Sequence, residues 1–379
     1  MLILPILVSA LAFSAPATAA VSPAAGSADS FALQASRVHV GDGRVIENGV
    51  IVVTDGAIRS VGASAPEGLS VRKVDGEIAP GFIAMRDATG ADSENNETTR
   101  KFTPTADVAR AFDPHHPAWA HLVSEGITTV VMTPASDRIA GGLDAIVSPA
   151  TGEIVKRGVA LHLGMSSRSI SNFVEPTSYA GLYAHLDRHF ADAADGSPFA
   201  QARSGATRVM MEALSKNEVA RAVAFAKQYG LTGAIIGAPE AGDQVDLLKS
   251  SGLGVVFEPL DAGDRADVAE SAKALRAAGV PFAFASDAGT HGPAAMRMTA
   301  ATCMRRGLDA QGALAAMTKT AADMLGVSAS HGTLEVGKVA DFVVWSGAPT
   351  DLTSRATHVF AGGKLVHESE RSSSHHTHR

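Results

Sequence analysis

The first part of the chain alternates short apolar stretches with turn residues. Within residues 31–62, the β-branched run 50–54 lies between Asn48-Gly49 and Asp55-Gly56, two dipeptides that favour tight hairpins. A further turn signal, Gly41-Asp42-Gly43, precedes them. This pattern predicts a small β-sheet module.

The same pattern returns near the other end of the chain. Residues 342–345 form an apolar strand, and residues 358–361 and 364–366 flank Gly362-Gly363 as a hairpin. Neither end is large enough to make a stable domain alone. We therefore expect the two ends to pair into one β-module.

Between the ends, short apolar strands alternate with amphipathic helices. The helix expected at residues 218–229 places Val219, Ala222, Val223 and Ala226 on one face, and Gly230 follows it as a C-terminal cap. The strand candidates, which recur roughly every 22 to 25 residues, are residues 209–211, 232–236, 254–257 and 280–285. Such repeated β/α units indicate a parallel barrel or an open parallel sheet.

Composition adjusts this picture in two ways. A chain of 379 residues that is 46% hydrophobic can form one TIM barrel, which takes about 250 residues, and a smaller accessory domain. The formal net charge is -7 and no basic stripe occurs, so the phosphate-neutralising surface of a nucleic-acid-binding protein is missing. Small molecules or other proteins are the expected partners.

The N-terminus has the features of a secretory signal. An apolar run covers residues 2–13, and the small residues Ala17, Thr18 and Ala19 suit signal-peptidase cleavage, although no Lys or Arg precedes the run. The run is shorter than the roughly 20 residues that span a bilayer. We expect a periplasmic or secreted protein without a membrane span. The single cysteine, Cys303, is expected in the core.

A series of short motifs runs along the chain: Ala79-Pro80-Gly81-Phe82-Ile83, Phe112-Asp113-Pro114, Gly126-Ile127-Thr128-Thr129-Val130, Ile139-Ala140-Gly141-Gly142, Ser286-Asp287, Gly-Thr-Leu-Glu-Val-Gly-Lys-Val-Ala-Asp at 332–341, and Gly362-Gly363-Lys364-Leu365-Val366. These motifs, in this order, resemble the amidohydrolase superfamily, in particular its imidazolonepropionase-related members. The stretch 332–341 closely matches that family's return from the barrel to the β-module.

The resemblance implies an α/β fold with a TIM (β/α)8-type barrel and a composite β-sandwich formed by both chain ends. The predicted limits are a signal peptide at 1–19, a linker at 20–30, the sandwich at 31–79 and 333–367, the barrel at 80–332 and a disordered polar tail at 368–379.

The family's chemistry implies one or two divalent metals, typically zinc, at the carboxyl ends of the strands, with an Asp after strand eight accepting a proton from the metal-bound water. The first-strand His-x-His positions hold Arg86, Asp87 and Ala88 here, and a guanidinium cannot ligate a metal. Two further ligand positions fall at Glu212 and near His162, and a third, near Gly237, offers no ligand.

Asp287 is the family position that is retained, and it is the predicted catalytic base. Asp287 and Glu212, with Glu258, could bind a hard cation through oxygen, or they could be ordinary loop carboxylates, and Asp287 could instead cap the next helix. His291 could act as an acid or base, or be a loop histidine. We also predict that Arg86 takes the place of the metal charge by pairing with Asp287 or Glu212.

Other histidines are expected to have no role in the site. His115 and His116 lie in a loop and point apart, so we expect them at the surface. His375, His376 and His378 lie in the polar tail.

Two functions remain open from the sequence. The first is a hydrolase that acts on a C–N bond of a small molecule (an amide, cyclic amide or dipeptide-like bond) with a degenerate metal site. The second is a non-catalytic relative that binds a ligand or pairs, as a homo- or hetero-oligomer, with another amidohydrolase. The substrate cannot be identified from residues 88–103 and 166–204, which carry no motif.

Overall fold

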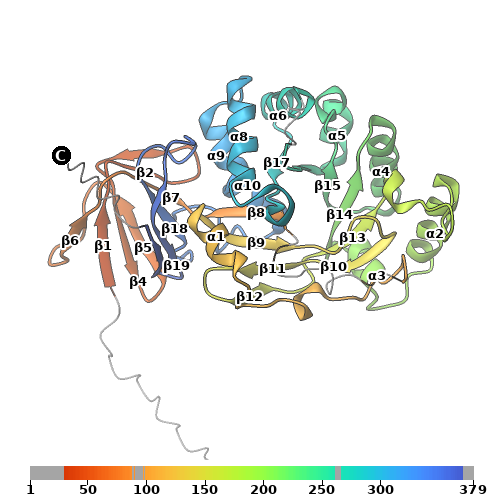
Figure 1. The fold of residues 1–379 in the computed structure, drawn as a ribbon, viewed down its shortest axis with the longest axis horizontal. Helices are drawn as coiled ribbons and strands as arrows, with labels where there is room; N and C mark the ends of the chain where they lie inside the picture. The colour runs from red at the N-terminus through yellow and green to blue at the C-terminus, as the bar shows by residue number, and fades with distance from the viewer. Residues whose placement is uncertain (1–29, 88, 90–96, 98, 261–265, 370–379) are drawn as a thin grey trace, which may run out of the picture.

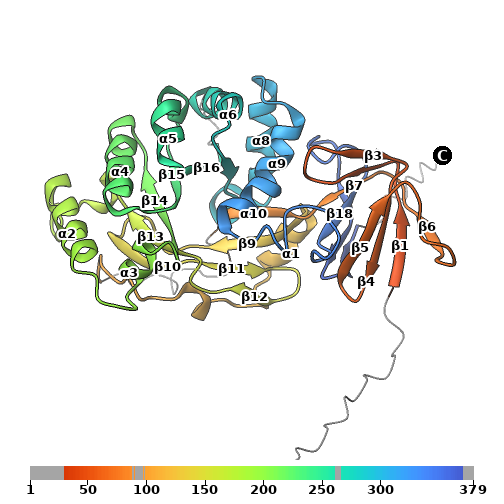
Figure 2. The same cartoon turned by 180° about the vertical axis from the view of Figure 1, so that it is seen from behind.

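The computed structural model describes residues 30–87, 89, 97, 99–260 and 266–369. The predicted signal peptide, almost all of the predicted linker, Ala88 and the tail histidines lie outside the described residues. Two parts are visible, a β-rich part that contains both ends of the described chain and a larger α/β part (Figures 1 and 2).

One sheet of the β-rich part comes entirely from the N-terminal segment. Its order is β5-β4-β1-β6. The β4–β5 hairpin turns at Asp55 and Gly56, both with positive φ (51° and 76°), as the sequence predicts. The strands are β1 (Ser30–Gln34), β4 (Val50–Thr54), β5 (Ala57–Gly62) and β6 (Val71–Lys73).

The second sheet combines strands from both ends of the chain, in the order β20-β19-β18-β7-β2-β3. The β19–β20 hairpin turns at Gly362-Gly363, as predicted, and β18 pairs antiparallel with β7. The strands are β2 (Arg37–His39), β3 (Val45–Glu47), β7 (Glu77–Pro80), β18 (Phe342–Trp345), β19 (Ala356–Ala361) and β20 (Lys364–Glu368). Ile51 and Ile58 of the first sheet share one buried cluster with Val38, Phe342 and Val344 of the second.

The hairpin predicted at Asn48-Gly49 is wrong. β3 and β4, the strands on either side, belong to different sheets, so this pair makes a crossover between them. Asn48 does take a positive φ of 50°, but Gly49 is required for space, because a Cβ there would lie 2.7 Å from a methyl carbon of Val38.

The larger part contains a series of parallel strands with helices on their outer side, together with the antiparallel strands β10, β11 and β12 (Figure 1). One sheet has the order β10-β13-β14-β15-β16-β17 and the other β12-β11-β9-β8. The strands are β8 (Phe82–Asp87), β9 (Ile127–Met132), β10 (Ala140–Leu143), β11 (Ala145–Ser148), β12 (Glu153–Lys156), β13 (Ala160–Gly164), β14 (Arg208–Ala213), β15 (Gly233–Gly237), β16 (Gly254–Phe257) and β17 (Phe282–Phe284).

The two sheets meet where β17 and β8 end. The backbone N–H groups of Ser286 and Asp287 both donate to the carbonyl of Arg86, at 3.1 and 3.3 Å. Among the described residues, no helix lies between β9 and β13, where the antiparallel strands β10, β11 and β12 intervene. The regular β/α alternation predicted from the sequence therefore holds from β13 onward.

The helices follow the strands as the apolar periodicity predicts. Helix α4 starts at a Ser215–Glu218 capping box and ends before Gly230, whose φ is 66°. The helices are α1 (Ala118–Ser124), α2 (Tyr179–Ala191), α3 (Pro198–Arg203), α4 (Lys216–Tyr229), α5 (Val245–Ser251), α6 (Ala266–Ala278), α7 (Ala288–His291), α8 (Ala295–Arg305), α9 (Ala310–Met317) and α10 (Lys319–Leu325), with 3-10 turns η2 (Val108–Arg110), η3 (Ser167–Ser169) and η4 (Ala241–Gln244).

Side chains along each strand alternate between two buried environments. Val209 and Val255 pack with helix residues such as Val223, whereas Met210 and Val256 lie in a second cluster with residues of other strands and of α10. Cys303 is buried in α8, as predicted. None of the helices in the described ranges is long and apolar enough to cross a membrane.

Candidate functional site

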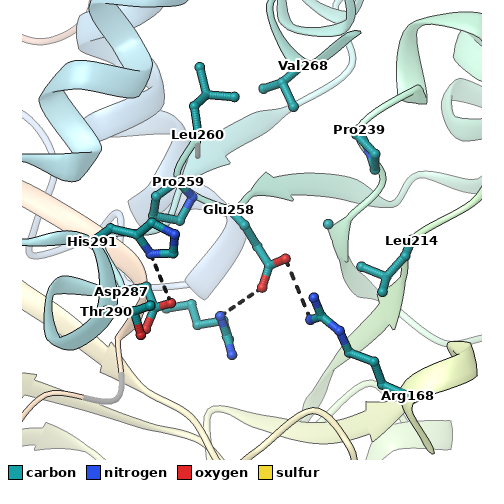
Figure 3. A pocket seen from close by; sticks show the side chains of 12 residues that line it. Arg168, Leu214, Pro239, Glu258, Pro259, Leu260, Val268, Asp287, Thr290 and His291 are labelled. Atoms are coloured by element: carbon teal, nitrogen blue, oxygen red, sulfur yellow. Dashed lines mark hydrogen bonds and ion pairs between the residues drawn. The ribbon is translucent and has the colours of Figure 1, made fainter. Parts of the chain in front are cut away.

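A cavity of about 470 Å³ opens where the parallel strands end (Figure 3). Parallel strands deliver the side chains that follow them to one edge, so residues far apart in the sequence meet there. The residues that line the cavity are Arg86, Arg168, Leu214, Gly237, Pro239, Glu258, Pro259, Leu260, Val268, Asp287, Thr290 and His291.

Two guanidinium groups and two carboxylates form a chain of ion pairs at this cavity. Arg86 Nη1 lies 2.8 Å from Glu258 Oε1, and Arg168 Nη1 lies 3.9 Å from Glu258 Oε2 and 3.3 Å from Glu212 Oε2. The Ser166 hydroxyl donates to the other oxygen of Glu212 at 2.5 Å. Glu212 is fully buried, so its charge depends on these two partners.

Arg86 therefore has a different partner from the one predicted. Its ion pair is with Glu258, not with Asp287 or Glu212. β8 and β16 each bring one of the two groups to the cavity, whereas Glu212 is held by Arg168. The sequence offered no motif for Arg168, which lies in the segment between β13 and α2.

The turn that carries Arg168 is anchored to the start of α4. The carboxylate of Glu218 accepts hydrogen bonds from the backbone N–H groups of Ser167 (2.8 Å), Leu214 (2.7 Å) and Ser215 (3.0 Å) and from the Tyr179 hydroxyl. Burial alone would raise the pKa of Glu218, but these hydrogen bonds outweigh burial and lower the pKa. Glu218 thus stays ionised and fixes the position of the turn.

Asp287 faces the cavity and does not cap the following helix. Its Oδ2 lies 3.4 Å from His291 Nδ1, and α7 has no side-chain hydrogen bond at its N-cap. Asp287 has a φ of 41°, an uncommon value for a residue with a Cβ. The loop amides are instead held by Asp87, which is fully buried and accepts from the N–H groups of Thr89 (2.6 Å) and Ala288 (3.2 Å) and from the Ser286 hydroxyl.

A second polar cluster, which sequence reasoning did not identify, lies inside the strands. His162 Nε2 lies 3.2 Å from Ser136 Oγ, and His162 Nδ1 lies 3.3 Å from Asp144 Oδ1. In the sequence, His162 is recognisable only as a polar residue in an apolar strand. Ser136 and Asp144 lie in connecting segments without a motif.

The remaining predicted candidates lie elsewhere. His115 is exposed, and His116 Nδ1 accepts from the backbone of Ala118 next to the ring of Trp119, which agrees with a role outside the site. Within the described ranges, no group of three or more His, Cys, Asp or Glu side chains is placed to hold a metal ion.

One known protein family matches more than half of the chain. A model described as the amidohydrolase family matches residues 115–366. The chain belongs to the amidohydrolase family. The resemblance seen in the sequence motifs is thereby confirmed.

Curated relatives match this chain over a short segment. The imidazolonepropionase of Pseudomonas savastanoi pv. phaseolicola is 46% identical over 84 residues, 21% of each chain, and that of Maricaulis maris is 48% identical over 77 residues, 19% of each. The matched segment spans about a fifth of the length of these relatives.

Solved structures of amidohydrolases resemble the chain over most of its length. An amidohydrolase from Thermotoga maritima is 21% identical with a TM-score of 0.80, covering 89% of this chain and 100% of its own. A prolidase in complex with N-methylphosphonate-L-proline is 18% identical with a TM-score of 0.59, covering 90% and 100%. These neighbours indicate a TIM-barrel-type fold of mixed α and β content.

Proposed function

We propose that this amidohydrolase-family protein binds a small zwitterionic molecule, such as an amino acid or dipeptide, and does so without the metal that the family resemblance implies. The observation that carries the proposal is the Arg86–Glu258 ion pair of 2.8 Å at the end of β8, where the first metal ligands would be expected. A fixed guanidinium there supplies positive charge in place of a cation.

The donor set does not fit a divalent cation. Arg86 has no lone pair to offer, and two guanidinium groups would repel an incoming cation. The three carboxylates considered as metal ligands are already engaged: Glu212 by Arg168 and Ser166, Glu258 by Arg86 and Arg168, and Asp287 by His291. These interactions support a site in which protein cations replace the metal.

The chemistry of the cavity suits a ligand that carries both charges. Both ion-pair contacts of Arg168 use Nη1, and its side chain is 52% exposed, which leaves Nε and Nη2 as donors for a ligand carboxylate. Asp287 offers an acceptor for an ammonium or amide N–H. Leu214, Leu260 and Val268 provide apolar contact for the ligand's hydrocarbon part.

Calorimetric titration tests this proposal. The full-length protein is titrated with N-methylphosphonate-L-proline and with L-alanyl-L-proline, before and after treatment with EDTA. We expect saturable binding that EDTA does not change and that Arg168→Met weakens by ~10-fold or more, since a charge-assisted hydrogen bond contributes roughly 1.5–3 kcal/mol.

Lys273→Met is the matched control, because it also removes one exposed cation but outside the cavity, and it should bind as the wild type does. Binding that disappears with EDTA, or that is the same in Arg168→Met, would overturn the proposal.

Hydrolysis of a C–N bond is the second candidate function, and one observation favours it. Asp287, the predicted base, pairs with His291 in the same cavity, an arrangement that can accept and pass on a proton. If the chain hydrolyses any member of an amide and dipeptide panel, Asp287→Asn should lower kcat by about 100-fold. Undiminished turnover in that variant would remove this role.

The domain architecture and the cellular location of the protein are also proposals. We propose a closed (β/α)8-type barrel at 80–332 beside a composite β-sandwich at 31–79 and 333–367. The β17–β8 contacts and the buried cluster shared by the two β-sheets support this division.

We also propose that residues 1–19 direct export, which N-terminal sequencing of the protein isolated from its native host would test.

A further inference from the structure

We propose that Ser136, His162 and Asp144 form a nucleophilic site that works without metal, in which Ser136 accepts the acyl group of an ester or an activated acyl compound. His162 Nε2 lies 3.2 Å from the Ser136 hydroxyl oxygen, and Nδ1 lies 3.3 Å from Asp144 Oδ1. One nitrogen of the imidazole thus faces the hydroxyl of a possible nucleophile, and the other faces a carboxylate that can orient the ring.

Strand pairing brings the three residues together from separate parts of the chain. His162 lies in the middle of β13 and pairs with Gly142 of β10, two residues before Asp144. Ser136 lies in the segment after β9, whose last residue, Met132, pairs with Ala145. The antiparallel strands between β9 and β13 therefore build this cluster, which a regular β/α unit would not.

The burial of Asp144 is costly and needs a reason. Asp144 and His162 are fully buried, and within the described part of the chain neither His162 Nδ1 nor either Asp144 carboxylate oxygen has a hydrogen-bond partner, so their 3.3 Å contact is an ion-pair distance. Burial raises the pKa of Asp144, while His162 and Arg86 act to lower it. The carboxylate of Asp144 lies on the Nδ1 side of the imidazole and the Ser136 hydroxyl on the Nε2 side, which is the arrangement that proton transfer from Ser136 to Nε2 requires.

The cluster lies next to the cavity. The Ser169 hydroxyl donates to the Ser136 carbonyl at 3.2 Å, and Arg168, the preceding residue of that turn, lines the cavity. Ser136 retains 5% exposure. A small acyl compound must therefore shift the Ser167–Ser169 turn, against the hydrogen bond that holds Ser167 to Glu218, before it reaches Ser136.

The reaction balances without a further reagent. Ser136 Oγ attacks the acyl carbon as its proton passes to His162 Nε2, and the bond to the leaving alcohol breaks as that alcohol takes the proton. Water then attacks the acyl-serine, gives its proton to Nε2 and releases the carboxylic acid, and Ser136 recovers its proton from His162.

Covalent labelling tests the nucleophile. The folded full-length protein is incubated with a fluorophosphonate probe in the presence of EDTA, and the modified peptide is mapped by tandem mass spectrometry. We expect the label on Ser136, and a loss of at least ~100-fold in labelling rate in Ser136→Ala and His162→Gln.

Ser204→Ala, which removes an exposed hydroxyl at the end of α3, is the control and should label as the wild type does. Mapping on the wild-type protein gives a result even where a core variant does not fold. An unlabelled Ser136 in the folded wild type, or a label on another serine, would refute the proposal. Neither outcome affects ligand binding by Arg168.

Asp144 acts through His162 and is a positioning residue. With p-nitrophenyl acetate as substrate, Asp144→Asn should lower kcat by roughly 100-fold at unchanged KM, because the imidazole loses its orientation while the acyl group still binds. A parallel change in KM, or an equal loss of folding and activity, would indicate a structural role alone.

Discussion

Replacement of Asp341 by asparagine should stabilise the protein at neutral pH. Asp341 precedes β18, and its side chain is 13% exposed; its Oδ1 accepts from the backbone N–H of Gly362 at 2.8 Å. Burial raises the pKa of this carboxyl from 3.8 to about 6, and the hydrogen bond from Gly362 offsets only part of that effect. At 1.36 kcal/mol per unit, the ionised form costs about 3 kcal/mol in the fold.

The dependence on pH follows from the direction of this shift. Between pH 4 and 6 the folded protein holds a proton on Asp341 that the unfolded chain has lost, so stability falls as the pH rises through this window. Burial lowers the pKa of His331, 3.9 Å away, so at neutral pH it carries no charge to compensate. An asparagine side chain at this position would keep the acceptor for Gly362 without a charge.

Urea unfolding at pH 4 and pH 7.5 measures the effect. We expect Asp341→Asn to raise the free energy of unfolding by up to ~3 kcal/mol at pH 7.5 and to leave it near the wild-type value at pH 4. Asp323→Asn, at an exposed ion pair with Lys319, should change it by less than ~0.5 kcal/mol at either pH. A destabilised Asp341→Asn protein at both pH values would refute the reasoning.

Two further substitutions test the packing between the parts of the molecule by urea unfolding. Arg297→Met removes an ion pair of 2.8 Å with Glu125 and a cation–π contact with Trp345, and should cost about 2–4 kcal/mol; a change below ~0.5 would contradict a structural role. Gly76→Ala should cost ~2 kcal/mol or more, because its φ is 111° and a Cβ would lie 1.8 Å from the Trp345 carbonyl oxygen, whereas Gly62→Ala, with open space around it, should be nearly neutral.

The sequence predicted most of the elements because their signals are local. β16 has the predicted bounds, and α4 differs from prediction only at its start, since a capping box and a C-terminal glycine define its ends. Asn48-Gly49 was misread because its dihedral preference is local, whereas the sheet that each flanking strand joins is decided by burial at long range.

The site was predicted less well, for a related reason. Arg86 lies near the end of β8, and Glu258 and Asp287 follow strands, so their strand positions made a shared cavity a hypothesis, but they could not decide which charges pair. Arg168 and Ser136 lie in irregular segments whose paths depend on the whole fold. Sequence motifs identified the family, but the chemistry depends on contacts that the motifs do not contain.

Zinc content is the measurement that tests the central claim most directly. In the full-length protein, His375, His376 and His378 are replaced by asparagine so that the tail cannot bind metal. The protein is incubated with zinc and dialysed, and its zinc is measured by inductively coupled plasma mass spectrometry. If the Arg86–Glu258–Arg168 network replaces the family's metal, bound zinc should stay below about 0.1 atom per chain. One zinc per chain, lost in Asp287→Asn or Glu212→Gln, would contradict the account.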